Sequence, residues 1–183
     1  MRVEVCILAG GRSTRMGRDK TRLRLGGMSL LTRLNRMAQE IRLPGRVIRR
    51  DLVPRCGPLG GIFTALKTTS AGAVLFLSCD MPFVATPLLK RLLREAHRSR
   101  RSVFIEQNGT VGFPFLCLRK SLPIVEEQIL RREFSLQKLA QACQAKTIRR
   151  PPQDPQLLNV NTPADWRRAR ELWTRMRRSI RKN

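Results

Sequence analysis

The chain has 183 residues, enough for one α/β domain with a substantial core. Hydrophobic residues make up 42% of it, which excludes a disordered protein, and no apolar run approaches the roughly 20 residues that span a bilayer. The 37 Lys and Arg residues outnumber 13 Asp and Glu, and the resulting net charge of +24 attracts polyanions. Because these cations are spread along the chain and aromatic residues are only 5%, we interpret most of them as solvated and expect no nucleic-acid partner.

The cysteines are odd in number, have scattered spacings and form no CxxC pair, which argues against zinc and against a disulfide framework. The single histidine, His97, lies among arginines, and we expect it to be exposed and to have no structural role. The apolar start flows directly into a glycine motif, so we expect no signal peptide and a reduced, cytoplasmic protein. The cysteines are Cys6, Cys56, Cys79, Cys117 and Cys143.

The first predicted element is a buried parallel strand, Val3–Leu8. It ends in the small residues Ala9, Gly10 and Gly11, which let an anion approach backbone N–H groups. Four cations follow within ten residues and could neutralise phosphate: Arg12, Arg15, Arg18 and Lys20. Neither GxxxxGK[ST] nor GxGxxG is present, and a surface turn with solvated charges is the alternative.

Residues 29–41 have the apolar spacing of an amphipathic helix, with Ser29 as its N-cap and Pro44-Gly45 after its end. Residues 46–51 form at most a short strand. The string GPLGG then leads to a helix predicted over residues 62–69. This glycine-rich approach is either a place where a ligand reaches the backbone or an ordinary turn.

Residues 73–79 form the most strand-like segment, and it ends abruptly at Asp80. An acid just past the carboxyl end of a buried parallel strand lies where open α/β sheets bind ligands. A single carboxylate plus phosphate oxygens suits Mg²⁺, so Asp80 is the candidate metal ligand. The alternative is that Asp80 caps the next helix, but Thr86 followed by Pro87 is the better start for a basic helix over residues 86–99.

The second half is predicted to contain a hairpin, two short helices, a small strand and a final basic helix. Asn108-Gly109 is the hairpin turn, and in LNVNTPAD Thr162 caps the last helix. We therefore predict one three-layer α/β/α domain with a mostly parallel, Rossmann-like sheet over residues 1–178, followed by a basic tail, 179–183. The hairpin strands cover residues 102–106 and 112–118, the helices 121–131 and 135–143, and the small strand 145–148.

The string LAGGxSxRMGxDK, from Leu8 to Lys20, resembles the signature of the molybdenum cofactor guanylyltransferase family of MobA-like NTP transferases. CDMPF, the Gly-x-Pro of the hairpin and LNVNTPAD are similar to further motifs of that family, in the same order. The resemblance implies a nucleotide-diphospho-sugar transferase fold. It also implies Mg²⁺-dependent transfer of GMP from GTP to molybdopterin that bears molybdate, with pyrophosphate as the second product.

The resemblance also implies roles for particular residues. Backbone groups of Leu8, Ala9, Gly10 and Gly11 would bind the nucleotide, and Arg15, Lys20 and Asp80 would be catalytic, with Mg²⁺ on Asp80. Asp51 would accept hydrogen bonds from guanine, unless it is only a loop acid paired with Arg49, Arg50 or Arg55. Pro114, Asn159 and Asn161 would line the acceptor side, although TPAD could be purely a capping device.

One departure from the family pattern concerns residues 41–51, where the second strand and its polar loop are shortened or missing. We expect the fold to survive because the two core strands remain. The alternatives are a relative that uses CTP or another phosphorylated acceptor, an inactive relative, and a basic nucleotide- or nucleic-acid-binding protein. The LAGG form favours GTP, and a molybdoenzyme or a chaperone would be a further partner. All of these expectations require that Gly10 and Asp80 face one phosphate-sized gap.

Overall fold

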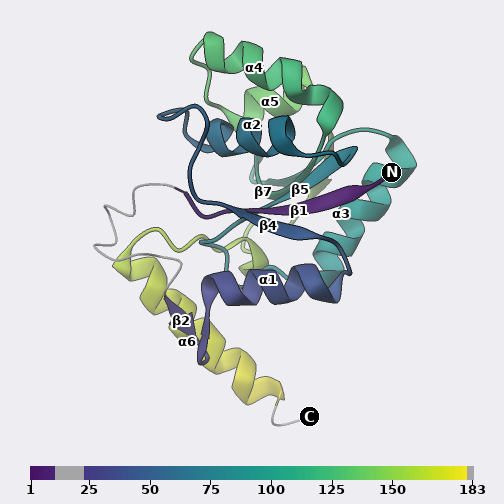
Figure 1. Cartoon of the computed structure of the whole chain (residues 1–183). Helices are drawn as coiled ribbons and strands as arrows, with labels where there is room; N and C mark the ends of the chain where they lie inside the picture. Colours follow the sequence, from purple (N-terminus) through teal and green to yellow (C-terminus); the bar gives the residue numbers. More distant parts are fainter. Residues whose placement is uncertain (11–22, 181–183) are drawn as a thin grey trace.

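The computed structural model describes residues 1–10 and 23–180, and in them a six-stranded sheet has the order β4-β1-β5-β7-β6-β8 (Figure 1). A small hairpin, β2–β3, stands apart from it. The strands are β1 (Val3–Leu8), β2 (Arg24–Leu25), β3 (Met28–Ser29), β4 (Gly45–Ile48), β5 (Ala73–Ser78), β6 (Val103–Gln107), β7 (Thr110–Leu118) and β8 (Lys146–Arg149). The helices are α1 (Leu30–Glu40), α2 (Pro58–Thr68), α3 (Thr86–Ser99), α4 (Leu122–Leu130), α5 (Leu136–Ala142) and α6 (Pro163–Ile180), with short 3₁₀ turns at Arg119–Ser121 and Pro155–Leu157.

The sheet is mostly parallel, as predicted. β1 pairs in parallel with β4 and with β5, and β6 pairs in parallel with β8. β7 alone runs the other way, because the tight turn at Asn108 and Gly109, both at positive φ, makes it the return arm of a hairpin with β6. The carboxyl ends of β4, β1, β5, β6 and β8 therefore share one edge of the sheet.

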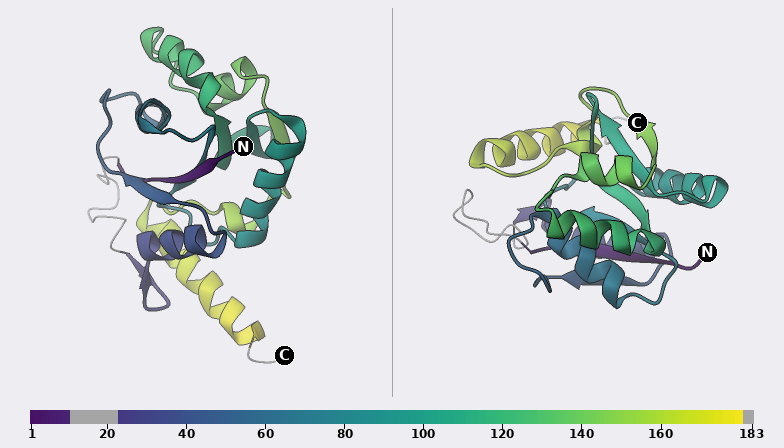
Figure 2. Two further views of the ribbon diagram at one scale, coloured as in Figure 1. Left: turned by 45° about the vertical axis from the view of Figure 1, so that its right-hand side comes forward. Right: turned by 90° about the horizontal axis from the view of Figure 1, so that it is seen from above.

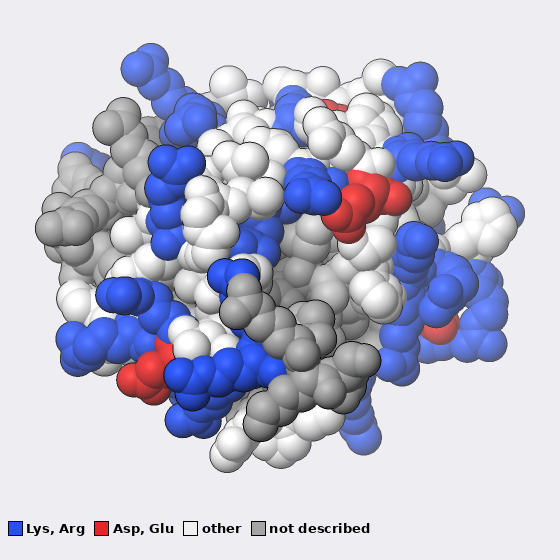
Figure 3. All heavy atoms as spheres, turned by 90° about the horizontal axis from the view of Figure 1, so that it is seen from below, with Lys and Arg blue, Asp and Glu red and all other residues white. Residues whose placement is uncertain are grey.

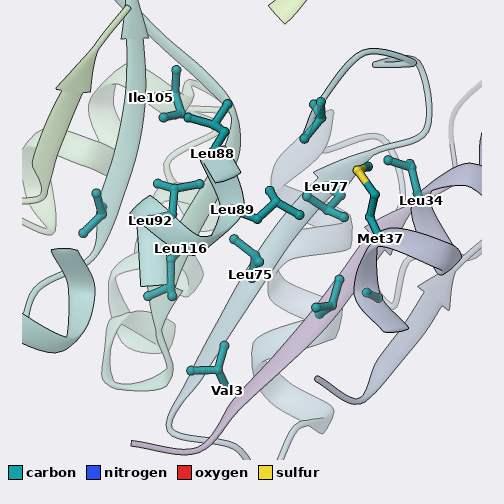
Figure 4. Packing of buried hydrophobic residues seen from close by; sticks show 14 of the residues in the cluster. Val3, Leu34, Met37, Leu75, Leu77, Leu88, Leu89, Leu92, Ile105 and Leu116 are labelled. Carbon is teal, nitrogen blue, oxygen red and sulfur yellow. The ribbon is translucent and has the colours of Figure 1, made fainter. Parts of the chain in front are cut away.

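Helices cover both faces of the sheet, which gives the predicted three layers (Figure 2). Alternating residues of β5 point to opposite faces: Leu75 and Leu77 join the core under α1 and α3, whereas Val74 and Phe76 join the core under α2, α4 and α5. Figure 4 shows the first of these cores, in which leucines from α3 meet side chains of the sheet and of α1.

A third, smaller apolar cluster joins the β2–β3 hairpin to α6, which extends away from the body of the sheet (Figure 1). Leu25 of the hairpin and Ala169 of α6 are both buried in it. No helix in the described residues is long and apolar enough to cross a membrane. Lys and Arg side chains are scattered over the face shown in Figure 3, in keeping with the dispersed charge of the sequence.

Several predicted boundaries are confirmed. β1 has the predicted limits, and Ser29 caps α1 by accepting a hydrogen bond from the Thr32 N–H at 3.0 Å. His97 is exposed. The second strand, predicted to be shortened or missing, is present as the four-residue β4 at one end of the sheet order.

One helix start and one N-cap were predicted wrongly, while the predicted range of α3, 86–99, is confirmed. α2 begins at Pro58, four residues before the predicted start, because Gly57 at φ +54° turns the chain and Pro58 fits the first helical turn. Gly60 and Gly61 therefore belong to the helix and not to a loop that approaches it. The N-cap of α3 is Ala85 and not Thr86, whose hydroxyl instead donates to Glu40 Oε2 at 2.7 Å.

Candidate active site

The carboxyl ends of β4, β1 and β5 lie side by side. In register, Leu8 is paired with Ile48 on one side and with Ser78 on the other. The pairing continues past the strands, because Ala9 N–H donates to Ile48 O at 2.9 Å and Cys79 N–H donates to Leu8 O at 3.2 Å. Gly10 and Asp80 each follow the end of one of these neighbouring strands, so the structure brings the two chain segments together as predicted.

Gly10 lies beside the loop that follows β4. A Cβ atom at this position would be 3.2 Å from the carbonyl oxygen of Arg49 and 3.8 Å from Asp51 Oδ1. The residue is exposed, so its backbone is accessible from outside. The absence of a side chain thus lets two loops run close together while the main chain stays open to a ligand.

Asp51 rests on the first turn of α2. A Cβ atom on Gly60 would lie 2.7 Å from Asp51 Oδ2 and 2.7 Å from Val53 O, and one on Gly61 would lie 3.4 Å from Asp51 Oδ1. Gly60 is therefore required because an acidic loop packs directly against this turn.

The Asp51 carboxylate is half-buried, and this burial raises its pKa. In the part of the chain that the structure describes, it makes no ion pair with Arg49, Arg50 or Arg55. The interpretation of Asp51 as a paired loop acid thus finds no support among the described residues.

Hydrogen bonds with Ser78 and Val160 are among the interactions that hold Asp80 at the end of β5. The Ser78 hydroxyl donates to Asp80 Oδ1 at 2.6 Å, and the Asp80 carbonyl accepts from Val160 N–H at 2.8 Å. Its carboxylate is half-buried, and it does not cap α3, whose N-cap is Ala85. Within the described ranges no three His, Cys, Asp or Glu side chains gather as a metal site, so a metal here would rest on one carboxylate and on ligand oxygens.

The bond from Val160 to Asp80 places Asn159 and Asn161 next to the end of β5. Asn159 is exposed, and Asn161 is half-buried. Asp165 Oδ2 accepts from the backbone N–H groups of Asn161 and Thr162, at 3.0 and 2.8 Å, while its own N–H donates to Thr162 Oγ1 at 3.2 Å. TPAD is therefore a capping box, and it also fixes the extended segment that carries both asparagines.

Pro114 lies in β7 where that strand leaves β5. The β5–β7 ladder ends at the pair Phe76 and Phe115, so Ser78 lies beyond its last pair. The pairing of β6 with β7 also shifts register between Phe104 and Ile105. Pro114 is buried, and we interpret it as a residue that shapes this edge of the sheet.

Three predicted site residues, Gly11, Arg15 and Lys20, lie outside the described residues. Two contributions were missed from the sequence: the Ser78 hydroxyl on Asp80, and the glycines of α2 beneath Asp51. The S-x-D spacing after an apolar strand was a usable signal for the first. Nothing local pointed to the second, because Asp51 and Gly60 meet only through the fold.

Comparisons with known proteins identify the family of this chain. The model of the MobA-like NTP transferase domain matches residues 5–49 and 35–147. A probable molybdenum cofactor guanylyltransferase of Carboxydothermus hydrogenoformans is 32% identical, over 93% of this chain and 96% of that protein. The molybdenum cofactor guanylyltransferase of Pseudomonas fluorescens is 30% identical, over 87% and 89%.

A solved structure supports the fold. Molybdopterin-guanine dinucleotide biosynthesis protein A of Archaeoglobus fulgidus superposes with a TM-score of 0.70 at 20% identity, over 94% of this chain and 99% of that one. The predicted nucleotide-diphospho-sugar transferase fold is thereby confirmed. With a matching domain model and relatives that cover nearly its full length, the chain belongs to the MobA-like NTP transferase family and is a nucleotidyltransferase.

Proposed function

We propose that this protein transfers GMP from GTP to the terminal phosphate of molybdopterin and releases pyrophosphate. The observation that carries the proposal is the adjacency of the β1 and β5 ends, which puts the open backbone at Gly10 and the carboxylate of Asp80 at one edge of the sheet. The choice of substrates rests on the similarity to molybdenum cofactor guanylyltransferases. We place the reaction in the cytoplasm, where the free cysteines stay reduced, and a molybdoenzyme or chaperone would receive the product.

The chemistry is an in-line displacement at phosphorus. An oxygen of the acceptor phosphate forms a bond to the α-phosphorus of GTP while the bond from that phosphorus to the bridging β-phosphate oxygen breaks. Such a reaction needs positioning and charge neutralisation more than covalent help. Backbone groups from Leu8 to Gly11 would hold the triphosphate, and the cations of Arg15 and Lys20 would balance its charge.

Asp80 fits a magnesium ion. Mg²⁺ binds one or two carboxylates and completes its shell with phosphate oxygens and water, and Asp80 offers one carboxylate oriented by Ser78. When bound, the ion would neutralise charge that develops on the phosphates. The residue would thus set the position of the donor and of the acceptor phosphates together.

Asp51 would select guanine. A carboxylate with two free oxygens accepts from the ring N–H and the amino group of guanine together, whereas cytosine presents no such pair of neighbouring donors. Asp51 has its carboxylate close to Gly10 and lacks an ion-pair partner among the described residues. On the acceptor side, the amides of Asn159 and Asn161 would bind the phosphate of the acceptor. Pro114 would shape the sheet edge beside them.

A pyrophosphate-release assay with GTP, Mg²⁺ and molybdopterin tests the proposal. The wild type should turn over, and Asp80→Asn should lose at least a hundredfold in kcat/KM because the metal loses the carboxylate that we propose binds it. Glu127→Gln, an exposed change on α4, is the matched control and should be unaffected.

CTP in place of GTP should give little product, and Asp51→Asn should weaken GTP binding more than CTP binding. GTP binding without turnover in the wild type would identify an inactive relative. Salt-sensitive binding to DNA or RNA without pyrophosphate release would instead identify a basic nucleic-acid-binding protein.

A further inference from the structure

Two cysteines that are distant in the sequence meet between β7 and the end of α5. Cys117 belongs to β7, and Cys143 is the C-cap residue of α5. The helix packs against this strand, both cysteines join the same apolar cluster, and their thiols are hydrogen-bonded to each other. Cys117 is paired with Val74 near the amino end of β5, whereas Asp80 follows the carboxyl end of that strand. The thiol pair therefore lies toward the opposite edge of the sheet from the candidate active site.

The backbone that carries Cys143 is fixed by the way α5 ends. Gln144 has φ +47° and turns the chain out of the helix. Cys143 N–H donates to Leu139 O at 2.9 Å, and Ala145 N–H donates to Ala140 O at 2.8 Å, as in a closed helix terminus with a left-handed residue. The approach of Cys143 to Cys117 is thus built into the packing of a helix end and does not depend on a loose loop.

Two buried serine hydroxyls complete the cluster around the sulfur atoms. Ser102 Oγ accepts from Leu118 N–H at 3.0 Å and donates to Cys117 Sγ at 3.8 Å. The Ser121 hydroxyl lies within hydrogen-bond reach of both sulfur atoms and can donate to either. Hydrogen bonds to a thiolate favour the charged form. The pair thus has polar support inside an otherwise apolar cluster.

The two thiols differ in their access to solvent. All the cysteines of the chain lie in the described residues; Cys143 is partly exposed, and the buried ones are Cys6, Cys56, Cys79 and Cys117. A hydrogen bond from Cys117 lowers the pKa of Cys143 to about 7, whereas burial raises the pKa of Cys6 to about 12. Because the thiolate is the nucleophile, Cys143 is the cysteine that an oxidant in solution reaches in reactive form at neutral pH.

We propose that Cys143 and Cys117 are a peroxide-reactive pair that closes reversibly into a disulfide. The Cys143 sulfur forms a bond to one oxygen of hydrogen peroxide while the O–O bond breaks, and the departing hydroxide takes up a proton and leaves as water. The Cys117 sulfur then forms a bond to the sulfur of the resulting sulfenic acid. The S–O bond breaks, and the Cys117 proton leaves with that oxygen as a second water, so the two thiols lose two electrons and the peroxide gains them.

The buried thiol thereby protects its neighbour. Once the disulfide has formed, Cys143 cannot proceed to the irreversible sulfinic acid, and a dithiol reductant restores both thiols. A transient bond of this kind is compatible with a reducing compartment. The inference goes beyond the proposed function, and its test needs no turnover.

The test exposes the folded protein to hydrogen peroxide and then counts free thiols after denaturation. The wild type should lose two of its five free thiols and two hydrogen atoms in mass, and peptide mapping should find Cys117 linked to Cys143. Dithiothreitol should reverse both changes. Cys117→Ser should instead accumulate sulfenic acid on Cys143, which dimedone traps, followed by sulfinic acid. Cys56→Ser is the matched control, since Cys56 is buried in the same apolar cluster, and it should still form the disulfide.

Cys143→Ser keeps the test decisive if the buried Cys117→Ser change prevents folding. Cys143 is only partly buried, so this variant should fold, and it should keep all of its remaining thiols under the same exposure. A wild type that retains all five free thiols, or that forms a disulfide between other cysteines, overturns the proposal. Sulfinic acid on Cys143 of the wild type without a disulfide also overturns it, because Cys117 would then not act on the sulfenic acid.

Discussion

The turn of the β2–β3 hairpin offers a comparison between two neighbouring glycines. Gly26 and Gly27 both have positive φ, +61° and +84°. A Cβ atom on Gly26 would lie 2.5 Å from Cε2 and 2.6 Å from Nε1 of Trp173, whereas a Cβ atom on Gly27 would meet nothing within 4 Å. Alanine at either position has the same conformational cost, and only Gly26→Ala also collides with α6.

The expected losses of stability differ accordingly. A left-handed backbone costs an alanine about 1 kcal/mol, so Gly27→Ala should lower the free energy of unfolding by that amount. Gly26→Ala adds overpacking of about 1–3 kcal/mol, which gives a total of about 2–4 kcal/mol. Trp173 cannot easily move away, because the Arg33 guanidinium stacks on it at 4.5 Å and Arg33 Nη2 donates to Leu25 O at 2.8 Å.

Urea and thermal unfolding followed by circular dichroism measure these losses. For a chain of this size 1 kcal/mol lowers Tm by roughly 2–4 °C, so the two variants are readily distinguished. Combining each with Trp173→Ala completes a double-mutant cycle, in which the extra cost of Gly26→Ala should disappear and the cost of Gly27→Ala should persist. Equal losses for Gly26→Ala and Gly27→Ala in the otherwise unchanged chain would refute the packing of α6 on this turn.

Three further predictions concern charged and titratable groups. Because burial raises the pKa of Asp51, its charged form destabilises the fold once the pH exceeds the ordinary carboxyl value, so Asp51→Asn should be more stable than wild type in urea at pH 7 and equally stable at pH 3. A hydrogen bond from Cys117 lowers the pKa of Cys143 to about 7, so iodoacetamide should label Cys143 first, at a rate that rises through pH 7, and Cys117→Ala should slow this labelling several-fold. The Arg46 side chain, 29% exposed, lies 2.5 Å from Glu4, so Arg46→Leu should cost about 2 kcal/mol in urea unfolding, and recovery of that loss by Glu4→Gln would confirm the unpaired acid as the cause.

Elements that depend on local pattern were predictable from the sequence. β1 is an apolar run with a glycine break, α1 has apolar spacing and a serine cap, and the β6–β7 turn follows from Asn108-Gly109. The candidate site residues Gly10 and Asp80 were predictable for the same reason, because each follows the end of a buried strand. In such cases a side chain's neighbours in sequence decide its conformation.

Contacts between distant segments were not predictable in this way. The start of α2 was misplaced because Gly60 is required by the packing of Asp51, from the loop before the helix, and not by a turn of its own. The packing of Trp173 on Gly26 likewise exists only once the chain has folded. The sequence by itself determined which segments are strands and helices and where charge follows them. The tertiary structure decided which of those ends meet, because strand order and helix packing depend on the burial of surfaces that are far apart along the chain.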